Sequence, residues 1–109
     1  MNTKKTFRRS NYVGAKAVLG RIAGPLSLGV FLESIRLGEE MNQVEFAKKL
    51  RISKSHICDI EKGRKNVSPA RAAQFAKLLG YSQEQFVRLA LQDIVKRDGL
   101  AYKVSIEAA

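Results

Sequence analysis

Five residues that favour the N-terminal cap of a helix recur at short intervals, and each precedes apolar residues at helical spacing. They are Ser27, Asn42, Ser53, Ser68 and Ser82. Glu45 and Gln85 stand three residues after Asn42 and Ser82, which is the spacing of a capping box. A chain of 109 residues has the size of one domain. The sequence therefore predicts an all-α fold, a cluster of four or five short helices with short connections.

The predicted helices also have recognisable ends and inward faces. Gly63 and Gly80 are typical of a left-handed residue after a helix, Pro69 suits a first helical turn, and the last helix should end near Arg97. The residues predicted to face the core are Leu28, Phe31, Leu32, Ile35, Phe46, Ala47, Leu50, Ile57, Ile60, Ala72, Phe75, Ala76 and Leu79.

The last helix and the residues that follow it carry more apolar surface than one small domain needs. Apolar residues of this helix span an arc of about 240°, although packing on one side needs little more than 100°. The surplus residues are Val87, Leu91 and Val95. After Gly99 the pattern alternates, with apolar Leu100, Tyr102, Val104 and Ile106, which predicts a short C-terminal β-strand.

A two-fold dimer would cover both features. The last helices would pack through Val87, Leu91 and Val95, and the two tail strands would pair antiparallel. A strand that folds back on its own domain, against the N-terminal arm around residues 12–18, remains the alternative. We therefore predict a homodimer whose interface is formed by Val87, Leu91, Val95, Leu100, Tyr102, Val104 and Ile106.

Charge divides the chain into three parts. The formal net charge is +10, which favours a polyanionic partner such as nucleic acid. Residues 1–26 hold six basic side chains and no acidic one and form a predicted basic arm. Residues 27–80 are mildly basic, and residues 81–109 are neutral. The arm is expected either to be a solvated terminus or to lie along phosphates.

Several classes of protein are excluded by composition. A single cysteine, Cys58, cannot form an intramolecular disulfide, and one His with one Cys disfavours a zinc site. The longest uncharged stretch, residues 22–32, is too short to span a membrane. We expect a cytoplasmic protein, associated with the nucleoid when bound to DNA, with no membrane association, no metal and no cofactor.

Residues 43–60 form the segment with the clearest functional pattern. Two short predicted helices are joined by a tight connection at Arg51 and Ile52. Ile57 and Ile60 should hold the second helix from inside, so that other side chains at its start face outward. Those side chains belong to Lys54, Ser55, His56 and Asp59. A protruding helix with polar residues in its first turns fits the DNA major groove.

The segment resembles the Xre/Cro type of helix-turn-helix regulator, which contains the λ-repressor-like DNA-binding domain. The resemblance rests on MNQVEFAKKL at 41–50, ISKSHI at 52–57 and DIEKGR at 59–64, and it extends over about residues 27–80. It implies a five-helix λ-repressor-like fold whose helix-turn-helix DNA-binding domain spans 27–80. The last helix and the strand, at 81–109, are the predicted dimerisation element. The family often has Gly where Arg51 stands, and arginine tolerates a left-handed conformation poorly.

The resemblance also implies a role for individual residues. Lys54, Ser55 and Asp59 would face base edges, and Gln43 would bind a phosphate and brace the recognition helix. The other implied phosphate contacts are His56, Lys62, Arg64, Lys65 and Asn66. Arg36 and Glu61 would form a buried ion pair between the first and third helices. Two alternatives stay open for Asp59: it reads cytosine N4, or it pairs with Lys62 within its helix.

We weigh four functions. The first is a sequence-specific regulator of transcription that binds double-stranded DNA, a repressor acting as a homodimer. The second is the antitoxin of a toxin–antitoxin pair, which would bind a toxin protein and autoregulate its operon. An enzyme is disfavoured, because Ser55, His56 and Asp59 lie within five positions of one helix and cannot form a nucleophile–base–orienter line. RNA binding is disfavoured as well, because the aromatic residues are largely needed for the core.

Overall fold

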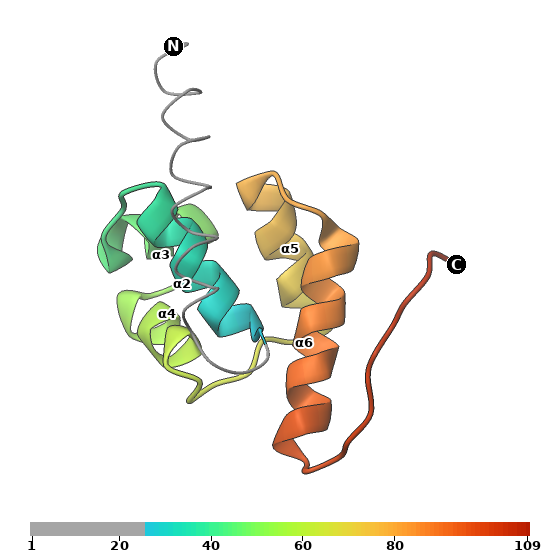
Figure 1. The fold of residues 1–109 in the computed structure, drawn as a ribbon. Helices are drawn as coiled ribbons and strands as arrows, with labels where there is room; N and C mark the ends of the chain where they lie inside the picture. Colours follow the sequence, from blue (N-terminus) through green and yellow to red (C-terminus); the bar gives the residue numbers. More distant parts are fainter. Residues whose placement is uncertain (1–25) are drawn as a thin grey trace.

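Helices build the core of the part of the protein that the computed structural model describes, residues 26–109. The helices of this part are α2 (Leu28–Gly38), α3 (Gln43–Leu50), α4 (Lys54–Glu61), α5 (Pro69–Leu79) and α6 (Gln83–Arg97) (Figure 1). The predicted all-α fold with five helices is confirmed for these residues. The predicted basic arm lies outside the described residues except for Leu26.

Each helix begins directly after its predicted cap. The side chains of Ser27, Asn42, Ser53, Ser68 and Ser82 accept a hydrogen bond from the backbone N–H three residues later. Asn42 and Glu45 form both halves of a capping box. The second capping box was wrong in one half, because the Gln85 side chain accepts from the Arg88 guanidinium at 3.0 Å instead of from the backbone of Ser82. An arginine one turn further along offers a charged donor to the same oxygen.

Of the residues that helical spacing assigned to the core, Phe31 and Leu79 are partly buried and pack against it, and the others are buried. Phe86, Leu89 and Ala90 of α6 are also buried, together with Val67 from the α4–α5 connection. Phe31 of α2 packs edge-on against Tyr81 and Phe86, at ring-centroid distances of 5.9 and 5.6 Å. These aromatic contacts join α2 to α6. No helix within residues 26–109 is long and apolar enough to cross a membrane.

The start of α2 is fastened to two other helices. A β-carbon added to Gly29 would overlap the backbone carbonyl oxygen of Ile60, so α2 crosses α4 at a distance that only glycine permits. The first N–H of α2, that of Leu28, donates to the Asp93 carboxylate of α6 at 3.0 Å. Burial raises the pKa of Asp93, against the opposing effect of this hydrogen bond. The position of α4 is therefore set by backbone packing against α2.

The predicted C-terminal strand does not form in the described single chain and is not confirmed by it. Residues 100–109 run back beside α6 without forming a strand in the described structure (Figure 1). Their backbone is held instead by the Gln92 side chain, which donates to the Tyr102 carbonyl at 2.8 Å and accepts from the Val104 N–H at 2.7 Å. The physical reason is that a strand needs a neighbouring backbone, and residues 26–109 offer this segment only one side-chain amide.

Candidate nucleic-acid interface

The connection between α3 and α4 keeps a tight turn although it has arginine where glycine is common. Arg51 adopts the left-handed conformation, with φ 61° and ψ 40°. Its N–H donates to the carbonyl of Lys48, and the N–H of Ile52 donates to the carbonyl of Ala47. These bonds satisfy the last carbonyls of α3 in the manner of a helix C-cap. The backbone strain of a non-glycine residue, about 1–2 kcal/mol, is therefore accepted at this turn.

The first turn of α4 presents two side chains to solvent. Lys54 and Ser55 are exposed, and neither side chain has a hydrogen-bond partner within residues 26–109. Ile57 and Ile60 are buried on the opposite side of the same helix. Ser53 caps the helix by accepting from the N–H of His56 at 3.0 Å. The outward positions at the start of α4 are thus held by a fixed backbone and remain available to a partner.

A buried ion pair lies behind α4. Arg36 of α2 donates to both carboxylate oxygens of Glu61, at 2.8 and 3.1 Å, and a third bond reaches the carbonyl of Met41 at 3.1 Å. The side chains of Arg36 and Glu61 are 12% and 3% exposed. This bidentate arrangement joins the end of α4 to α2, and it places together the two residues that the family resemblance pairs.

Gln43 completes this buried network from α3. Its side-chain amide donates to Oε1 of Glu61 at 3.0 Å. Because Gln43 is the first residue of α3 and Glu61 the last of α4, the bond joins the two helices of the motif across their turn. The structure thus gives Gln43 a bracing contact with α4, and its partly exposed side chain lies at a helix N-terminus, where backbone N–H groups favour an anion.

Asp59 organises the loop that follows α4. Its carboxylate lies 2.8 Å from Nε of Arg64 and 3.6 Å from Nζ of Lys65. Its carbonyl accepts from the N–H of both residues, at 2.8 and 3.3 Å. The hydrogen bond from Arg64 is the main cause that lowers the pKa of Asp59. The side-chain partners of Asp59 are therefore residues beyond the helix, and within residues 26–109 no hydrogen bond or ion pair joins its carboxylate to Lys62.

The remaining predicted phosphate contacts lie at the end of α4 and in the same loop. Lys62, the residue that caps the end of α4, is exposed, as are Arg64, Lys65 and Asn66. Asn66 accepts a hydrogen bond from Arg97 of α6 at 3.0 Å. Sequence reasoning missed Arg97, because a contact between residues so far apart along the chain leaves no local pattern. The end of α6 therefore brings another cation to this loop.

Arg71 is a second functional candidate that sequence reasoning missed. It is exposed in the first turn of α5, and its Nη1 lies 3.2 Å from Nδ1 of His56. Burial lowers the pKa of His56, and the charges of Arg71 and Lys65 lower it further, whereas Asp59 raises it. A cation in the first turn of a helix opposes the helix dipole. That unfavourable position is the signal by which Arg71 could have been noticed.

The dimer residues predicted from the sequence divide into two groups. Val87, Leu91 and Val95 of α6 are half-buried, and so are Val104 and Ile106 of the tail. Leu100 and Tyr102 are exposed, Tyr102 to 71%.

Within the described residues no group of His, Cys, Asp and Glu side chains could hold a metal ion.

Comparison with known proteins supplies the family. A family model described as a helix-turn-helix domain matches residues 27–89, more than half of the chain. The match runs from the cap of α2 into the middle of α6 and includes the whole α3–turn–α4 unit. No match was found among curated proteins or among solved structures. With the exposed first turn of α4 on its braced frame, this match shows that the chain belongs to the helix-turn-helix domain family and is a DNA-binding regulator.

Proposed function

We propose that this protein is a sequence-specific repressor of transcription of the Xre/Cro type, which binds double-stranded DNA as a homodimer in the cytoplasm. One observation carries the proposal: Lys54 and Ser55 project from the first turn of a helix whose inner face and far end are fixed by buried contacts. A rigid helix with free hydrogen-bonding side chains at its N-terminal end is the geometry that reads base edges in the major groove.

Phosphate contacts would come from the two sides of α4. Lys62, Arg64 and Lys65 follow the helix, and the Asp59 carboxylate holds the last two in place before DNA arrives. Arg71 of α5 brings a further cation beside His56 of α4, and the proposal assigns these two side chains to a second phosphate contact. Such contacts fix the register of a protein on the duplex, whereas base contacts decide its sequence preference. In the complex, the Asp59 carboxylate then either keeps its ion pairs with Arg64 and Lys65 or accepts a hydrogen bond from cytosine N4.

A homodimer fits the repressor proposal, because a symmetric operator presents two half-sites about one helical turn apart. Occupying a promoter needs no chemistry, and the proposal assigns the chain no catalytic step. The proposal uses the polar side chains of α4 for binding: the His56 ring faces Arg71, and the Asp59 carboxylate faces Arg64.

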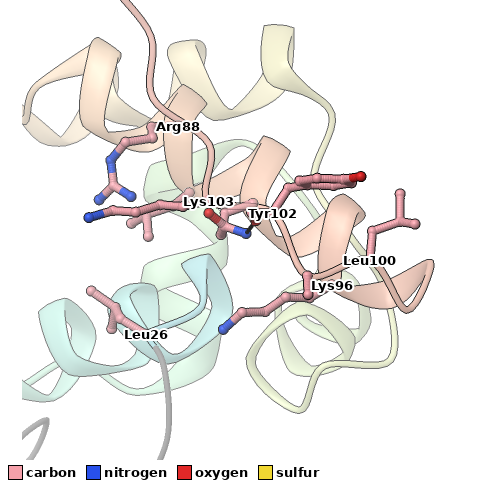
Figure 2. A pocket seen from close by; sticks show the side chains of 9 residues that line it. Leu26, Arg88, Lys96, Leu100, Tyr102 and Lys103 are labelled. Carbon is pink, nitrogen blue, oxygen red and sulfur yellow. Dashed lines mark hydrogen bonds between the residues drawn. The ribbon is translucent and has the colours of Figure 1, made fainter.

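One observation favours the antitoxin as a second candidate function. A groove of about 430 Å³ lies between the start of α2, α6 and the tail (Figure 2). Leu26, Leu89 and Leu100 contribute apolar surface, and the cationic side chains of Arg88, Lys96 and Lys103 lie at its rim. A groove of this kind suits an acidic segment of a partner protein. Co-purification of the chain with the product of the adjacent gene tests this candidate. A monodisperse chain that forms no complex with that product would count against it.

The base-reading and phosphate-binding residues should differ in their effect on affinity. Replacing Lys54 by Ala should cost about 1–3 kcal/mol on the preferred DNA and relax the preference at one base position. Replacing Lys62 by Ala should weaken binding to every sequence about equally and reduce the salt dependence of the affinity. Fluorescence anisotropy with matched and scrambled duplexes over a range of salt concentrations measures both effects.

A matched control for these two variants is Lys77→Ala, because Lys77 is an exposed lysine in the last turn of α5. It removes the same charge from a helix that the proposal does not place in the groove. Its affinity should stay close to that of the unmodified chain. If Lys54→Ala and Lys77→Ala lost affinity to the same extent on all sequences, Lys54 would not read a base.

DNA affinity should rise as the pH falls. The pKa of His56 lies below its usual value in the free protein, because of burial and of the neighbouring Arg71. A phosphate placed against His56 would favour the protonated ring and raise this pKa, so that binding takes up a proton. The gain should appear as the pH falls through the raised pKa of His56 in the complex and level off below the pKa of His56 in the free protein. His56→Gln should remove it, and an unchanged pH dependence in that variant would exclude His56 from the phosphate contact.

A further inference from the structure

The Gln92 side chain makes the hydrogen bonds to the tail backbone that a neighbouring strand would make. It is 9% exposed on α6, and its amide donates to the carbonyl of Tyr102 and accepts from the N–H of Val104. Figure 2 shows this side of α6 with Tyr102 and Lys103 of the tail. A strand in a parallel ladder makes the same two bonds on either side of one residue, here Lys103. Gln92 therefore holds one backbone edge of an extended segment.

The other backbone edge of the tail has no partner. Successive residues of an extended chain point their N–H and C=O groups to opposite edges. Since Tyr102 and Val104 face Gln92, the backbone groups of Lys103 and Ser105 face away from α6. None of these groups has a hydrogen-bond partner within residues 26–109. An open edge of this kind pairs readily with another strand.

We propose that the open edge pairs antiparallel with the same segment of a second copy, in a register centred on Ser105. This inference rests on the homodimer of the proposed function and specifies how its tails meet. In this register Ser105 faces Ser105 of the second copy, and Lys103 faces Glu107. The residues with outward backbone groups are then the ones that exchange hydrogen bonds in an antiparallel pair.

The side chains select a second copy as the occupant. Lys103, Ser105 and Glu107 are exposed, whereas Val104 and Ile106 are half-buried, so the tail has a polar face and an apolar face. In the register centred on Ser105, each Lys103 lies opposite a Glu107 and each Val104 lies opposite an Ile106. Among the registers that keep these faces aligned, this one alone sets the two opposite charges across from each other. Neither Lys103 nor Glu107 belongs to an ion pair within residues 26–109.

The two-stranded ribbon needs support from α6. A ribbon of two short strands is only marginally stable alone in water. Gln92 fixes each strand to its own α6. The half-buried Val87, Leu91 and Val95 of that helix are the apolar residues that the sequence assigns to the same dimer interface. Gln92 is thus a positioning residue for the dimer, since it acts on the partner through the backbone of the tail.

Charge reversal tests the register directly. Lys103→Glu and Glu107→Lys should each place like charges opposite one another at two symmetric sites and weaken dimerisation by about tenfold or more. The double variant restores opposite charges and should dimerise within about threefold of the unmodified chain. Sedimentation equilibrium measures the dissociation constants. Lys77→Glu and Glu84→Lys change the net charge equally outside the register and should leave dimerisation unchanged.

Three further variants test the geometry. In a Cys58→Ser background, Ser105→Cys should form a disulfide between two copies under mild oxidation, because facing residues of this kind lie about 5.5 Å apart between Cα atoms, within the range of a disulfide. Ala101→Cys should not. Gln92→Leu should weaken dimerisation in the same way as Lys103→Glu, while circular dichroism checks that its helices are retained.

The outcomes separate this inference from the proposed function. A double charge reversal that fails to restore dimerisation, or no crosslink at residue 105, would overturn the register. A chain that stays monomeric at micromolar concentrations and still binds specific DNA would overturn the pairing and leave the DNA-binding proposal standing. If the charge-reversal variants behave as expected but the chain binds no DNA, the tail pairing would stand and the DNA-binding proposal would be overturned. Tails that pair only with a different protein would show the second copy to be the wrong occupant.

Discussion

Replacing Glu61 by Gln is expected to lower the free energy of unfolding by about 3–5 kcal/mol, the cost of breaking one member of a buried ion pair. The carboxylate of Glu61 accepts two bonds from Arg36 and one from Gln43, and its side chain is 3% exposed. Neutralising it leaves the Arg36 guanidinium largely buried without a counter-charge. Arg36→Met should cause a similar loss of stability, because it leaves the buried Glu61 carboxylate without its counter-charge.

Urea unfolding followed by circular dichroism measures the loss, and Glu33→Gln is the control. Glu33 is 3.9 Å from the same guanidinium, but its side chain is 41% exposed, so that pair should contribute under about 1 kcal/mol. The double variant Arg36→Met/Glu61→Leu should lose less than the sum of the single variants, because no unpaired charge remains. Unchanged stability of both single variants would show that the pair does not support the fold.

Replacing Gly29 by Ala should destabilise the domain by about 3 kcal/mol or more, at the upper end of the cost of overpacking. The added β-carbon would overlap the carbonyl oxygen of Ile60, and a backbone atom within a helix cannot move aside as a flexible side chain can. To relieve the overlap, α2 must shift away from α4. DNA affinity should fall with stability, since α4 carries Lys54 and Ser55.

Thermal unfolding of Gly29→Ala and of a control, Gly38→Ala, tests this expectation. Gly38 is the last residue of α2 and does not have a positive φ, so alanine there should be tolerated or slightly stabilising. A melting temperature of Gly29→Ala equal to that of the unmodified chain would mean that α2 and α4 do not meet as closely as the structure has them.

The helices could be predicted from the sequence because their signals are local. A cap such as Ser53 acts on an N–H three residues away, and a buried face such as Phe46, Ala47 and Leu50 repeats with the turn of the helix. The family resemblance added Arg36 and Glu61, which no local pattern would pair across 25 residues. The close crossing at Gly29 left no sequence signal of its own, since glycine within a helix has several uses.

The conformation of the tail and the contacts of the cationic side chains could not be predicted from the sequence. Alternation from Leu100 to Ile106 indicated an extended segment, but a strand also needs a neighbouring backbone, and the described chain supplies only Gln92. Arg71 and Arg97 contact His56 and Asn66 from other helices, and such contacts depend on how the helices pack. Asp59 pairs with Arg64 and Lys65 because the chain turns back after α4, which spacing along a straight helix could not reveal.

Selection of bound duplexes from a random pool of double-stranded DNA tests the central claim, that α4 reads base sequence, most directly. The proposal predicts an enriched site with two half-sites related by two-fold symmetry and centred about 34 Å apart, one turn of the double helix. The same selection with Lys54→Ala should lose the preference at one position in each half-site. Bound DNA without any enriched sequence, or an unchanged site for Lys54→Ala, would contradict it.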